Sequence, residues 1–247
     1  MTTPALQLSG LSKAFGGLPA ANDVSMEVMP GERRLIIGPN GAGKTTLFNL
    51  VTGDLPRDSG TIRLFGEDIS RLRPDQRAQR GLARTYQIIT LFPKDSLEHN
   101  IVLALLGLSK TRWNAFGALA AHTGLYEEAR RSLALVGLEH LARRPIAEVA
   151  YGERRRVEIA MALAQKPRLL LLDEPLAGLS REERTALKEL IAGIPREVTV
   201  VMIEHDMDTA LDLAERITVL HYGSVIVEGT RAEVVADPRT REIYLGD

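Results

Sequence analysis

The chain has 247 residues, enough to bury a sizeable core in one or two domains. Its formal net charge of -1 and the lack of a long basic run argue against nucleic acid or an anionic membrane as its main partner. With zero cysteines, the chain has no disulfide framework and no thiolate metal site. It shows neither a signal-peptide pattern nor an apolar run of roughly 20 residues, so we expect a cytoplasmic protein that reaches a membrane only through partners.

The first elements in the chain follow strand patterns. Apolar and polar residues alternate over residues 6–11 and again over 24–28, which predicts two antiparallel strands. The apolar run at 33–37 predicts a short buried strand, and residues 45–51 predict a helix that ends near Gly53. A glycine-rich segment joins this strand to this helix.

That segment matches the phosphate-binding pattern G-x-x-x-x-G-K-[ST] without a mismatch. Its glycines let backbone N–H groups surround phosphate oxygens, and the helix N-terminus adds partial positive charge. Lys44 would reach the β- and γ-phosphates of ATP, and the Thr45 hydroxyl would bind Mg²⁺. A glycine-rich turn without a ligand is the alternative, which the strand, loop and helix context disfavours. The expected nucleotide-binding residues are Gly38, Pro39, Asn40, Gly41, Ala42, Gly43, Lys44, Thr45 and Thr46.

The middle of the chain changes from strand patterns to helical ones. Residues 61–65 and 81–86 have strand patterns, and a short helix at 74–80 lies between them. From 96 to 164 the strand signals disappear and helical spacing takes over. We interpret 96–164 as an α-helical subdomain inserted into an α/β core. The core then comprises residues 1–95 and 165–247.

In the last third of the chain, strands and helices alternate, which predicts a mainly parallel sheet covered on both faces. The expected elements are strands at 168–173, 198–204, 217–221 and 224–228, and helices at 181–192, 207–214 and 231–236. The predicted fold is therefore an α/β P-loop NTPase (RecA-like) core with an antiparallel β subdomain and an inserted α-helical subdomain, all in a single domain over residues 1–247.

Two carboxylates follow the strand of four leucines at 169–172. Because open parallel sheets bind ligands at the carboxyl ends of their strands, Asp173 and Glu174 are expected close to the phosphate loop. Asp173 would hold the Mg²⁺ shell, and Glu174 would orient and deprotonate the attacking water. Capping of the next helix is the alternative role for these acids. With a complete phosphate loop, the pair predicts ATP hydrolysis.

With these motifs in order, the chain resembles the ATP-binding subunits of ABC transporters from about residue 6 to its C-terminus. The acidic pair stands at the place of the family's Walker B motif. Gln87 stands at the Q-loop, where it would sense the γ-phosphate, join the Mg²⁺ shell and contact the membrane partner. His205 matches the switch histidine, whose ring N–H would bind the γ-phosphate. Phe15 lies where the family has an aromatic ring that stacks on adenine. Taken singly, each of these three fits an ordinary structural role.

The resemblance also places a signature motif, LSGGQ in the family, at the start of a predicted helix. In the family this motif binds, in trans, the ATP held by a second subunit. Here it comprises Ala150, Tyr151, Gly152 and Glu153. Ala150 lacks the family's serine hydroxyl and Tyr151 replaces a glycine, but backbone N–H groups around Gly152 can still hold phosphate. In the D-loop at 176–180, Ser180 replaces the usual Asp or Asn, which puts its communication across a dimer in doubt.

Such a composite site implies a homodimer or a heterodimer with a second ABC ATPase subunit. The resemblance further implies integral membrane permease subunits, an indirect link to a substrate-binding protein, and a position on the inner face of the cell membrane. We expect the permease to dock between residues 88 and 113, where an apolar run follows the Q-loop.

Several stretches resemble the ATPases of branched-chain amino-acid or urea importers, namely residues 15–18, 150–160, 203–207 and 243–247. The lipopolysaccharide-transport ATPase shares part of this pattern. We favour amino-acid import, with urea or amide import and lipopolysaccharide transport as alternatives. A non-transport ABC ATPase that acts on nucleic acid or ribosomes is disfavoured by the single nucleotide-binding unit and the absence of a zinc module. A P-loop kinase or GTPase would not carry the signature motif.

Overall fold

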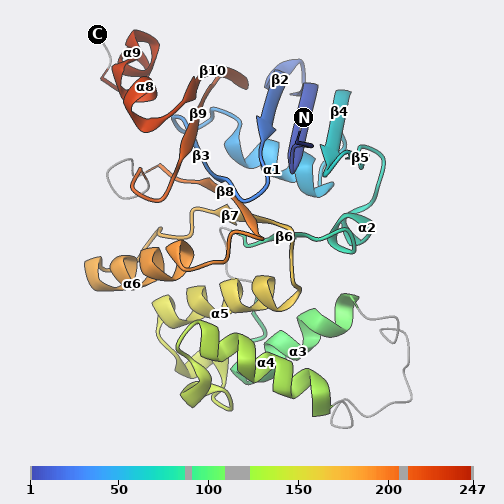
Figure 1. Cartoon of the computed structure of the whole chain (residues 1–247), viewed down its shortest axis with the longest axis vertical. Coiled ribbons are helices and arrows are strands. Elements are labelled where there is room, and N and C mark those ends of the chain that lie inside the picture. The colour runs from blue at the N-terminus through green and yellow to red at the C-terminus, as the bar shows by residue number, and fades with distance from the viewer. Residues whose placement is uncertain (1, 87–90, 109–122, 206–210, 246–247) are drawn as a thin grey trace. The chain divides into compact units, whose positions relative to one another are not determined.

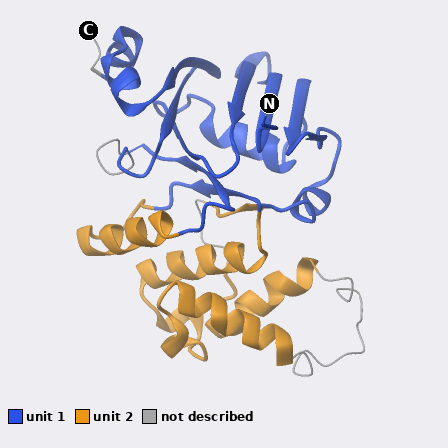
Figure 2. Ribbon diagram, in the orientation of Figure 1, with its two compact units in different colours: residues 1–82, 168–175, 194–247 blue, residues 83–167, 176–193 orange. Residues whose placement is uncertain are grey.

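Figure 1 shows the computed structural model of the chain, which describes residues 2–86, 91–108, 123–205 and 211–245. The chain divides into two compact units (Figure 2). Unit 1 comprises Met1–Leu82, Arg168–Pro175 and Ile194–Asp247, and unit 2 comprises Ala83–Pro167 and Leu176–Gly193. Unit 2 therefore extends beyond the expected insertion at 96–164. The D-loop and the helix after it belong with the helices, since Leu190 packs against their core.

Unit 1 contains an antiparallel sheet in the order β2-β1-β4-β5. Its strands are β1 (Leu6–Phe15), β2 (Leu18–Val28), β4 (Ser59–Leu64) and β5 (Glu67–Asp68). β1 and β2 form a hairpin whose register runs from the Leu6 and Val28 pair to the Phe15 and Leu18 pair. Leu6 and Leu8 are buried while the polar residues between and after them are more exposed, as the alternation in the sequence predicts.

The second sheet has the order β10-β9-β3-β8-β7-β6. Its strands are β3 (Arg33–Ile37), β6 (Leu82–Arg84), β7 (Leu169–Asp173), β8 (Thr199–Ile203), β9 (Arg216–His221) and β10 (Ser224–Gly229). β9, β3, β8 and β7 are parallel, and β10 runs antiparallel to β9. Every residue of β3, β7 and β8 is buried, which fits the apolar runs at 35–37, 169–172 and 200–203. The carboxyl ends of these three strands therefore lie side by side.

The described residues of unit 1 include the helices α1 (Lys44–Thr52), α2 (Pro74–Ala78), α8 (Arg231–Ala236) and α9 (Pro238–Leu245). α1 ends at Gly53, whose left-handed conformation (φ 83°) stops the helix. One hydrophobic core joins Leu47 and Phe48 of α1 with residues of both sheets, including Leu8 and Leu169. α1 is thus packed between the two sheets of its unit.

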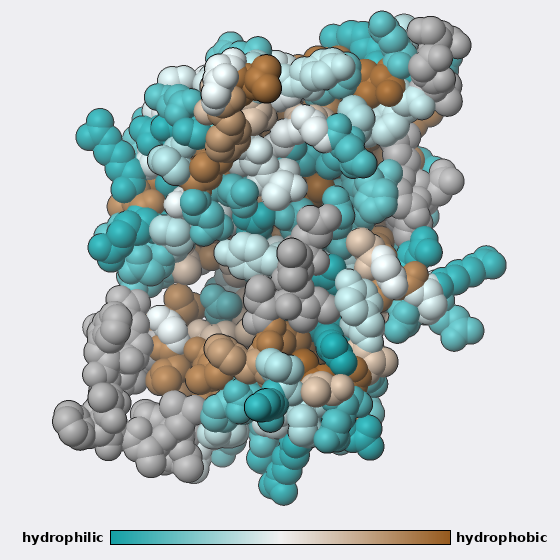
Figure 3. All heavy atoms as spheres, turned by 180° about the vertical axis from the view of Figure 1, so that it is seen from behind, coloured by the Kyte–Doolittle hydropathy of each residue, from teal (hydrophilic) through white to brown (hydrophobic). Residues whose placement is uncertain are grey.

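Unit 2 is built from α3 (Leu97–Leu108), α4 (Thr123–Leu135), α5 (Tyr151–Ala164) and α6 (Arg181–Ala192), with single 3₁₀ turns at Glu139–Leu141 and Ile146–Glu148. α3, α4 and α5 share a core that includes Ile101, Leu133 and Val157. The apolar side chains in the second half of α3, such as Leu103 and Leu106, are only half-buried. Figure 3 shows hydrophobic side chains at the surface of this unit.

The predicted fold class is confirmed. The main difference concerns the helix expected at 207–214, of which residues 211–213 form a turn and the first four lie outside the described residues. β5 and α9 were not expected from the sequence. In the described part of the chain, no helix combines the length and apolar character that a membrane crossing requires.

Candidate active site

The phosphate-binding loop connects the end of β3 to the start of α1. Gly43 has a φ of 98°, and a Cβ there would come within 2.2 Å of the Ala20 carbonyl oxygen on β2, so only glycine fits. Among the described residues no side chain caps α1, and its first turn has no acid. The N–H groups at this helix end therefore remain available to an anion, and the positive end of the helix dipole is not neutralised.

Lys44 is the first residue of α1, and its ammonium group folds back over the loop. Its Nζ donates to the carbonyl oxygens of Gly38, at 2.6 Å, and Pro39, at 3.1 Å. Burial lowers the pKa of Lys44, and the charges of Glu174 and Asp173 oppose that shift. The loop therefore holds a cation whose counter-charges come from the end of β7.

The Walker B carboxylates lie at the same edge of the sheet as the loop. In the parallel register, Asp173 of β7 aligns with Ile203 of β8, which aligns with Ile36 of β3. Adjacent strands are about 4.8 Å apart, so about 10 Å separates the β3 and β7 backbones. The backbone N–H of Glu174 donates to the Ile203 carbonyl oxygen at 3.0 Å. This bond fixes the residue just beyond the end of the ladder.

Glu174 has a left-handed backbone conformation, with φ 46°. That conformation is unfavourable for a side chain other than glycine, asparagine or aspartate, and costs of order 1 kcal/mol or more. Strain of this kind persists where neighbouring bonds hold the backbone, and it concentrates at functional sites. The turn directs the chain away from the sheet while the carboxylate stays at its edge.

His205 follows β8 and lies beside this carboxylate. Its Nδ1 is 4.0 Å from Glu174 Oε2, with the two side chains 56% and 16% exposed. The distance is too long for a hydrogen bond but within the range of an ion pair if the ring is protonated. The structure thus brings together Lys44 at the start of α1 and the residues Glu174 and His205, which follow the neighbouring strands β7 and β8.

The expected Mg²⁺ ligands supply hard oxygen donors. Thr45 lies in the first turn of α1 with its side chain accessible, and Asp173 is 1% exposed at the end of β7. Within the described ranges, no group of three or more His, Asp or Glu side chains forms a ready metal site. Mg²⁺ commonly binds through one or two protein oxygens plus substrate phosphates, so this sparse donor set fits a metal that arrives with a nucleotide. Gln87, the third expected ligand, lies outside the described residues.

Phe15 lies at the end of β1 with its side chain 50% exposed. The Nζ of Lys13 is 5.7 Å from its ring centroid. The partner strand β2 approaches the loop, since a Cβ added at Gly43 would come within 2.2 Å of the Ala20 carbonyl oxygen. An exposed aromatic ring on this hairpin is therefore free to take a planar ligand on its face.

The signature residues lie in unit 2, at the start of α5. Ala150 precedes the helix and contributes no side-chain cap. The backbone N–H of Ala150 donates to the Glu153 carboxylate at 2.7 Å. Tyr151 is 43% exposed, and a Cβ added at Gly178 of the D-loop would lie 3.3 Å from the Tyr151 ring. The tyrosine that replaces a family glycine therefore packs on the D-loop.

The structure also shows a residue that the sequence analysis did not single out. The carboxylate of Glu183, in the first turn of α6, accepts hydrogen bonds from the backbone N–H groups of Ser180, at 2.9 Å, and of Gly152. These bonds lower the pKa of Glu183, and the Ser180 bonds have the largest effect. The Gly152 N–H, which we expected to hold phosphate, is therefore occupied by a carboxylate. The S-x-x-E pattern at 180–183 predicts a capping box, but not this second contact.

Arg155 is a second residue that sequence analysis left unexplained. It is 3% exposed, and its guanidinium donates to the Tyr86 carbonyl oxygen at 2.9 Å and to Glu158 at 3.1 Å. Tyr86 immediately precedes Gln87 in the chain. A buried arginine of the signature helix thus holds the backbone just before the expected Q-loop.

Comparison with known proteins decides the family. A family model described as ABC transporter matches residues 21–177. The chain belongs to this family. It is 39% identical to the high-affinity branched-chain amino acid transport ATP-binding protein BraF of Pseudomonas aeruginosa, over 100% of both chains. It is 37% identical to the protein of that description called LivG in Escherichia coli K12, again over 100% of both.

Solved structures of this family show the same fold. The ADP conformation of MJ1267, an ATP-binding cassette of an ABC transporter, superposes with a TM-score of 0.89 at 30% identity and covers 100% of both chains. A nucleotide-free cassette from an ABC transporter gives a TM-score of 0.87 at 28% identity, over 99% of this chain and 100% of the other. The chain is therefore an ATP-binding cassette with an ABC-type ATPase fold.

Proposed function

We propose that this chain hydrolyses ATP to power an importer of branched-chain amino acids. The proposal rests on two full-length relatives described as branched-chain amino acid transport ATP-binding proteins, and on the side chains that meet at the carboxyl edge of the parallel sheet. The observation that carries it is the convergence of Lys44, at the uncapped N-terminus of α1, with Glu174 and His205, which follow the neighbouring strands β7 and β8. Units 1 and 2 would together form the single ABC ATPase domain.

In this mechanism the chain's own groups divide the work. The α1 N-terminus and Lys44 bind the β- and γ-phosphates, and Lys44 exchanges its bonds to the loop carbonyls for bonds to phosphate oxygens. Glu174 orients a water and accepts its proton at a carboxylate oxygen. His205 donates a ring N–H to the γ-phosphate, and Phe15 stacks on the adenine ring.

Mg²⁺ would be held by Thr45 and Asp173, with Gln87 as the third expected ligand. When bound, it would neutralise charge on the phosphates during their transfer. Asp173 fits this role because it is acidic and buried, and because it ends β7, which only β8 separates from β3, the strand that leads into the loop. Among the described residues, Thr45 and Asp173 are the expected Mg²⁺ ligands.

The second half of the site would come from another subunit. Residues 150–153 of one chain would meet the γ-phosphate held by a second, identical or related ABC ATPase chain. The half-buried leucines of α3 lie in the segment where we place permease docking, and hydrophobic docking would position the dimer on the inner face of the membrane. A substrate-binding protein would act on the other side of the permease.

Transport in a reconstituted system tests this proposal. The chain is combined in proteoliposomes with the permease subunits and binding protein of its own importer, and ATP-driven uptake of labelled leucine is measured. We expect uptake that the Lys44→Ala variant abolishes and the exposed-surface control Glu197→Gln retains. ATPase activity without leucine uptake would overturn the substrate assignment but not the enzymatic one.

A further inference from the structure

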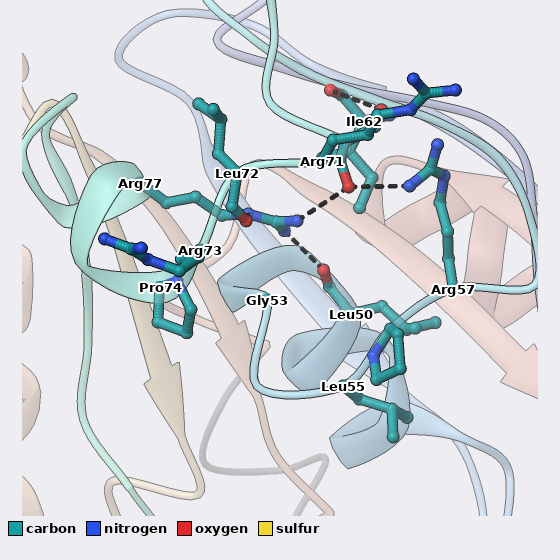
Figure 4. A pocket seen from close by; sticks show the side chains of 12 residues that line it. Leu50, Gly53, Leu55, Arg57, Ile62, Arg71, Leu72, Arg73, Pro74 and Arg77 are labelled. Atoms are coloured by element: carbon teal, nitrogen blue, oxygen red, sulfur yellow. Dashed lines mark hydrogen bonds between the residues drawn. The ribbon is translucent and has the colours of Figure 1, made fainter.

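A pocket of about 390 Å³ lies in unit 1, away from the phosphate loop. It is formed by the end of α1, the segment that follows it, and the chain that leads into α2 (Figure 4). Among the twelve described residues that line it, four are arginines and none is acidic. The lining residues are Leu50, Gly53, Leu55, Pro56, Arg57, Ile62, Ser70, Arg71, Leu72, Arg73, Pro74 and Arg77.

Arg77 is the most buried of these arginines, with 4% of its surface exposed. Its guanidinium donates to the carbonyl oxygens of Leu50 and Val51, both at 2.7 Å, and to those of Leu72 and Ser70. These bonds give hydrogen-bond donors to carbonyl oxygens in the last turn of α1. The carbonyl oxygens offer the guanidinium only partial negative charge in return. Burial lowers its pKa to about 10; the neighbouring charge of Arg57 acts in the same direction, and the charge of Asp54 opposes the shift.

Arg57 shares one of these acceptors. Its Nη1 donates to the Ser70 carbonyl oxygen at 2.7 Å, and Nη2 of Arg77 donates to the same oxygen at 3.2 Å (Figure 4). Two guanidinium groups that meet at one oxygen are no more than about 6 Å apart. Neither makes an ion pair with a carboxylate of the described chain. Like charges at this distance favour a bound anion.

Arg71 adds a third cation at the pocket. It is exposed, and its guanidinium makes no hydrogen bond or ion pair with any residue that the structure describes. Arg73 differs, because Asp75 neutralises it through two contacts of 3.1 Å. The pocket thus offers three guanidinium groups that make no ion pair with a described carboxylate, although the charges of Asp54 and Asp68 act on Arg77 and Arg57. A guanidinium is well suited to carboxylate or phosphate oxygens.

The remaining lining is apolar. Leu50, Leu55, Ile62 and Leu72 contribute aliphatic surface, together with two prolines. A cavity with a hydrophobic lining and a few convergent polar groups is typical of small-molecule sites, and its volume lies in their usual range of about 300–1,000 Å³. A simple inorganic ion would leave the apolar wall uncovered.

We propose that this pocket binds a small amphiphilic anion, a short aliphatic chain that carries a carboxylate or a phosphate monoester. The charged group meets Arg57, Arg71 and Arg77, and the chain covers the leucines. The site is separate from the nucleotide site, because the nine residues of α1 place its two ends about 14 Å apart. Binding is therefore compatible with a bound nucleotide.

Calorimetry with the full chain, in saturating Mg-ADP to occupy the phosphate loop, tests the proposal. The probes are isocaproate, isoamyl phosphate, and isocaproamide as the uncharged analogue. We expect saturable binding of at least one anion with a Kd of about 1 mM or lower. The amide should show no binding at the concentrations that saturate the anion. The anion that binds identifies whether the carboxylate or the phosphate is preferred.

Variants locate the binding to this pocket. Arg71→Ala removes a side chain with no described partner, so the fold should be unaffected, and we expect affinity to fall by about tenfold or more. Arg63→Ala, on β4 and outside the lining, should bind as the unchanged chain does. No saturable binding of either anion, equal binding of the amide, or unchanged affinity in Arg71→Ala together with Arg57→Ala would overturn the proposal. Thermal melting of each variant checks that it is folded.

Discussion

At the scale of single residues, the backbone of Glu174 has the clearest functional meaning. The chain must leave β7 immediately after Asp173, yet the side chain stays near His205 and within the field of Lys44. A left-handed conformation at Glu174 satisfies both demands. Its cost is offset because the Glu174 N–H donates to the Ile203 carbonyl oxygen, which fixes the peptide before this residue at the sheet edge.

Glu174→Gln tests the role of this carboxylate as a base. Glutamine keeps the shape of the side chain but cannot accept the proton of the attacking water, so we expect turnover to fall by about 10²–10⁴-fold. ATP binding should be retained, since the phosphate loop is untouched. Phosphate release and binding of a fluorescent ATP analogue measure the two effects. The exposed Glu197→Gln serves as control. Turnover of Glu174→Gln within about twofold of this control would exclude Glu174 as the base, because a change of that size is no larger than a minor electrostatic effect.

Lys44→Ala tests the cation of the loop. The substitution removes a charged donor to the phosphates, which we expect to weaken ATP binding by about 10–100-fold and to abolish hydrolysis. The exposed Lys94→Ala should bind ATP normally. Unchanged nucleotide affinity in Lys44→Ala, measured by titration calorimetry, would show that the loop does not bind ATP through this side chain.

At the scale of elements, the first turns of α5 and α6 share one carboxylate. Glu183 caps α6 through Ser180 and also binds the Gly152 N–H of α5. If residues 150–153 receive a γ-phosphate from another subunit, a fixed negative charge already stands at that helix end. This arrangement opposes closure on ATP until the carboxylate turns away.

We therefore predict that Glu183→Gln favours closure. Glutamine can still accept a hydrogen bond from Ser180, but it removes the charge that competes with phosphate. Interactions of charges with helix ends are worth about 0.3–1 kcal/mol, so the apparent KM for ATP should fall by about 2–5-fold. The adjacent, exposed Glu182→Gln is the control. An unchanged or higher KM in steady-state ATPase assays would contradict this role.

Ser180 offers a separate test of the same element. Its hydroxyl accepts a hydrogen bond from the Glu183 N–H, so the serine that stands in place of the family's Asp or Asn caps α6. Ser180→Ala should lower the free energy of unfolding by about 0.5–2 kcal/mol. Urea denaturation measures this change, and no loss of stability would mean that the cap is not formed in solution.

The sequence predicted elements best where their ends carry strong signals. β3, α6 and α8 begin and end where expected. The first contains the apolar run at 35–37 just before the phosphate loop, and Ser180 and Thr230 cap the other two. β5 is too short to have a pattern. α9 starts at Pro238, directly after α8, and a proline fits the first turn of a helix as well as the end of the one before it.

The candidate site was predictable to the extent that local motifs define it. The phosphate loop and the carboxylates after β7 follow from strand, glycine and leucine patterns. The bond from Glu183 to Gly152 joins residues 31 positions apart, and no periodicity in the sequence reports such a contact. The strain at Glu174 likewise depends on the neighbouring strand, which only the folded sheet supplies.

At the scale of the whole molecule, the phosphate loop and the signature belong to different units of one chain. Unit 1 contains Lys44, Glu174 and His205, and unit 2 contains residues 150–153 and Glu183. A chain that binds ATP with one unit and offers a phosphate-binding helix end on the other can pair head to tail with a second copy. ATP would then form part of the interface, and its hydrolysis would release the pair.

Light scattering of the Glu174→Gln variant tests this composite site most directly. Because the variant binds ATP without hydrolysing it, the closed pair should persist. We predict that its molar mass doubles in saturating Mg-ATP, relative to the 27.1 kDa chain, and returns to the monomer value in Mg-ADP. A monomer in Mg-ATP, with nucleotide shown to be bound, would contradict the account.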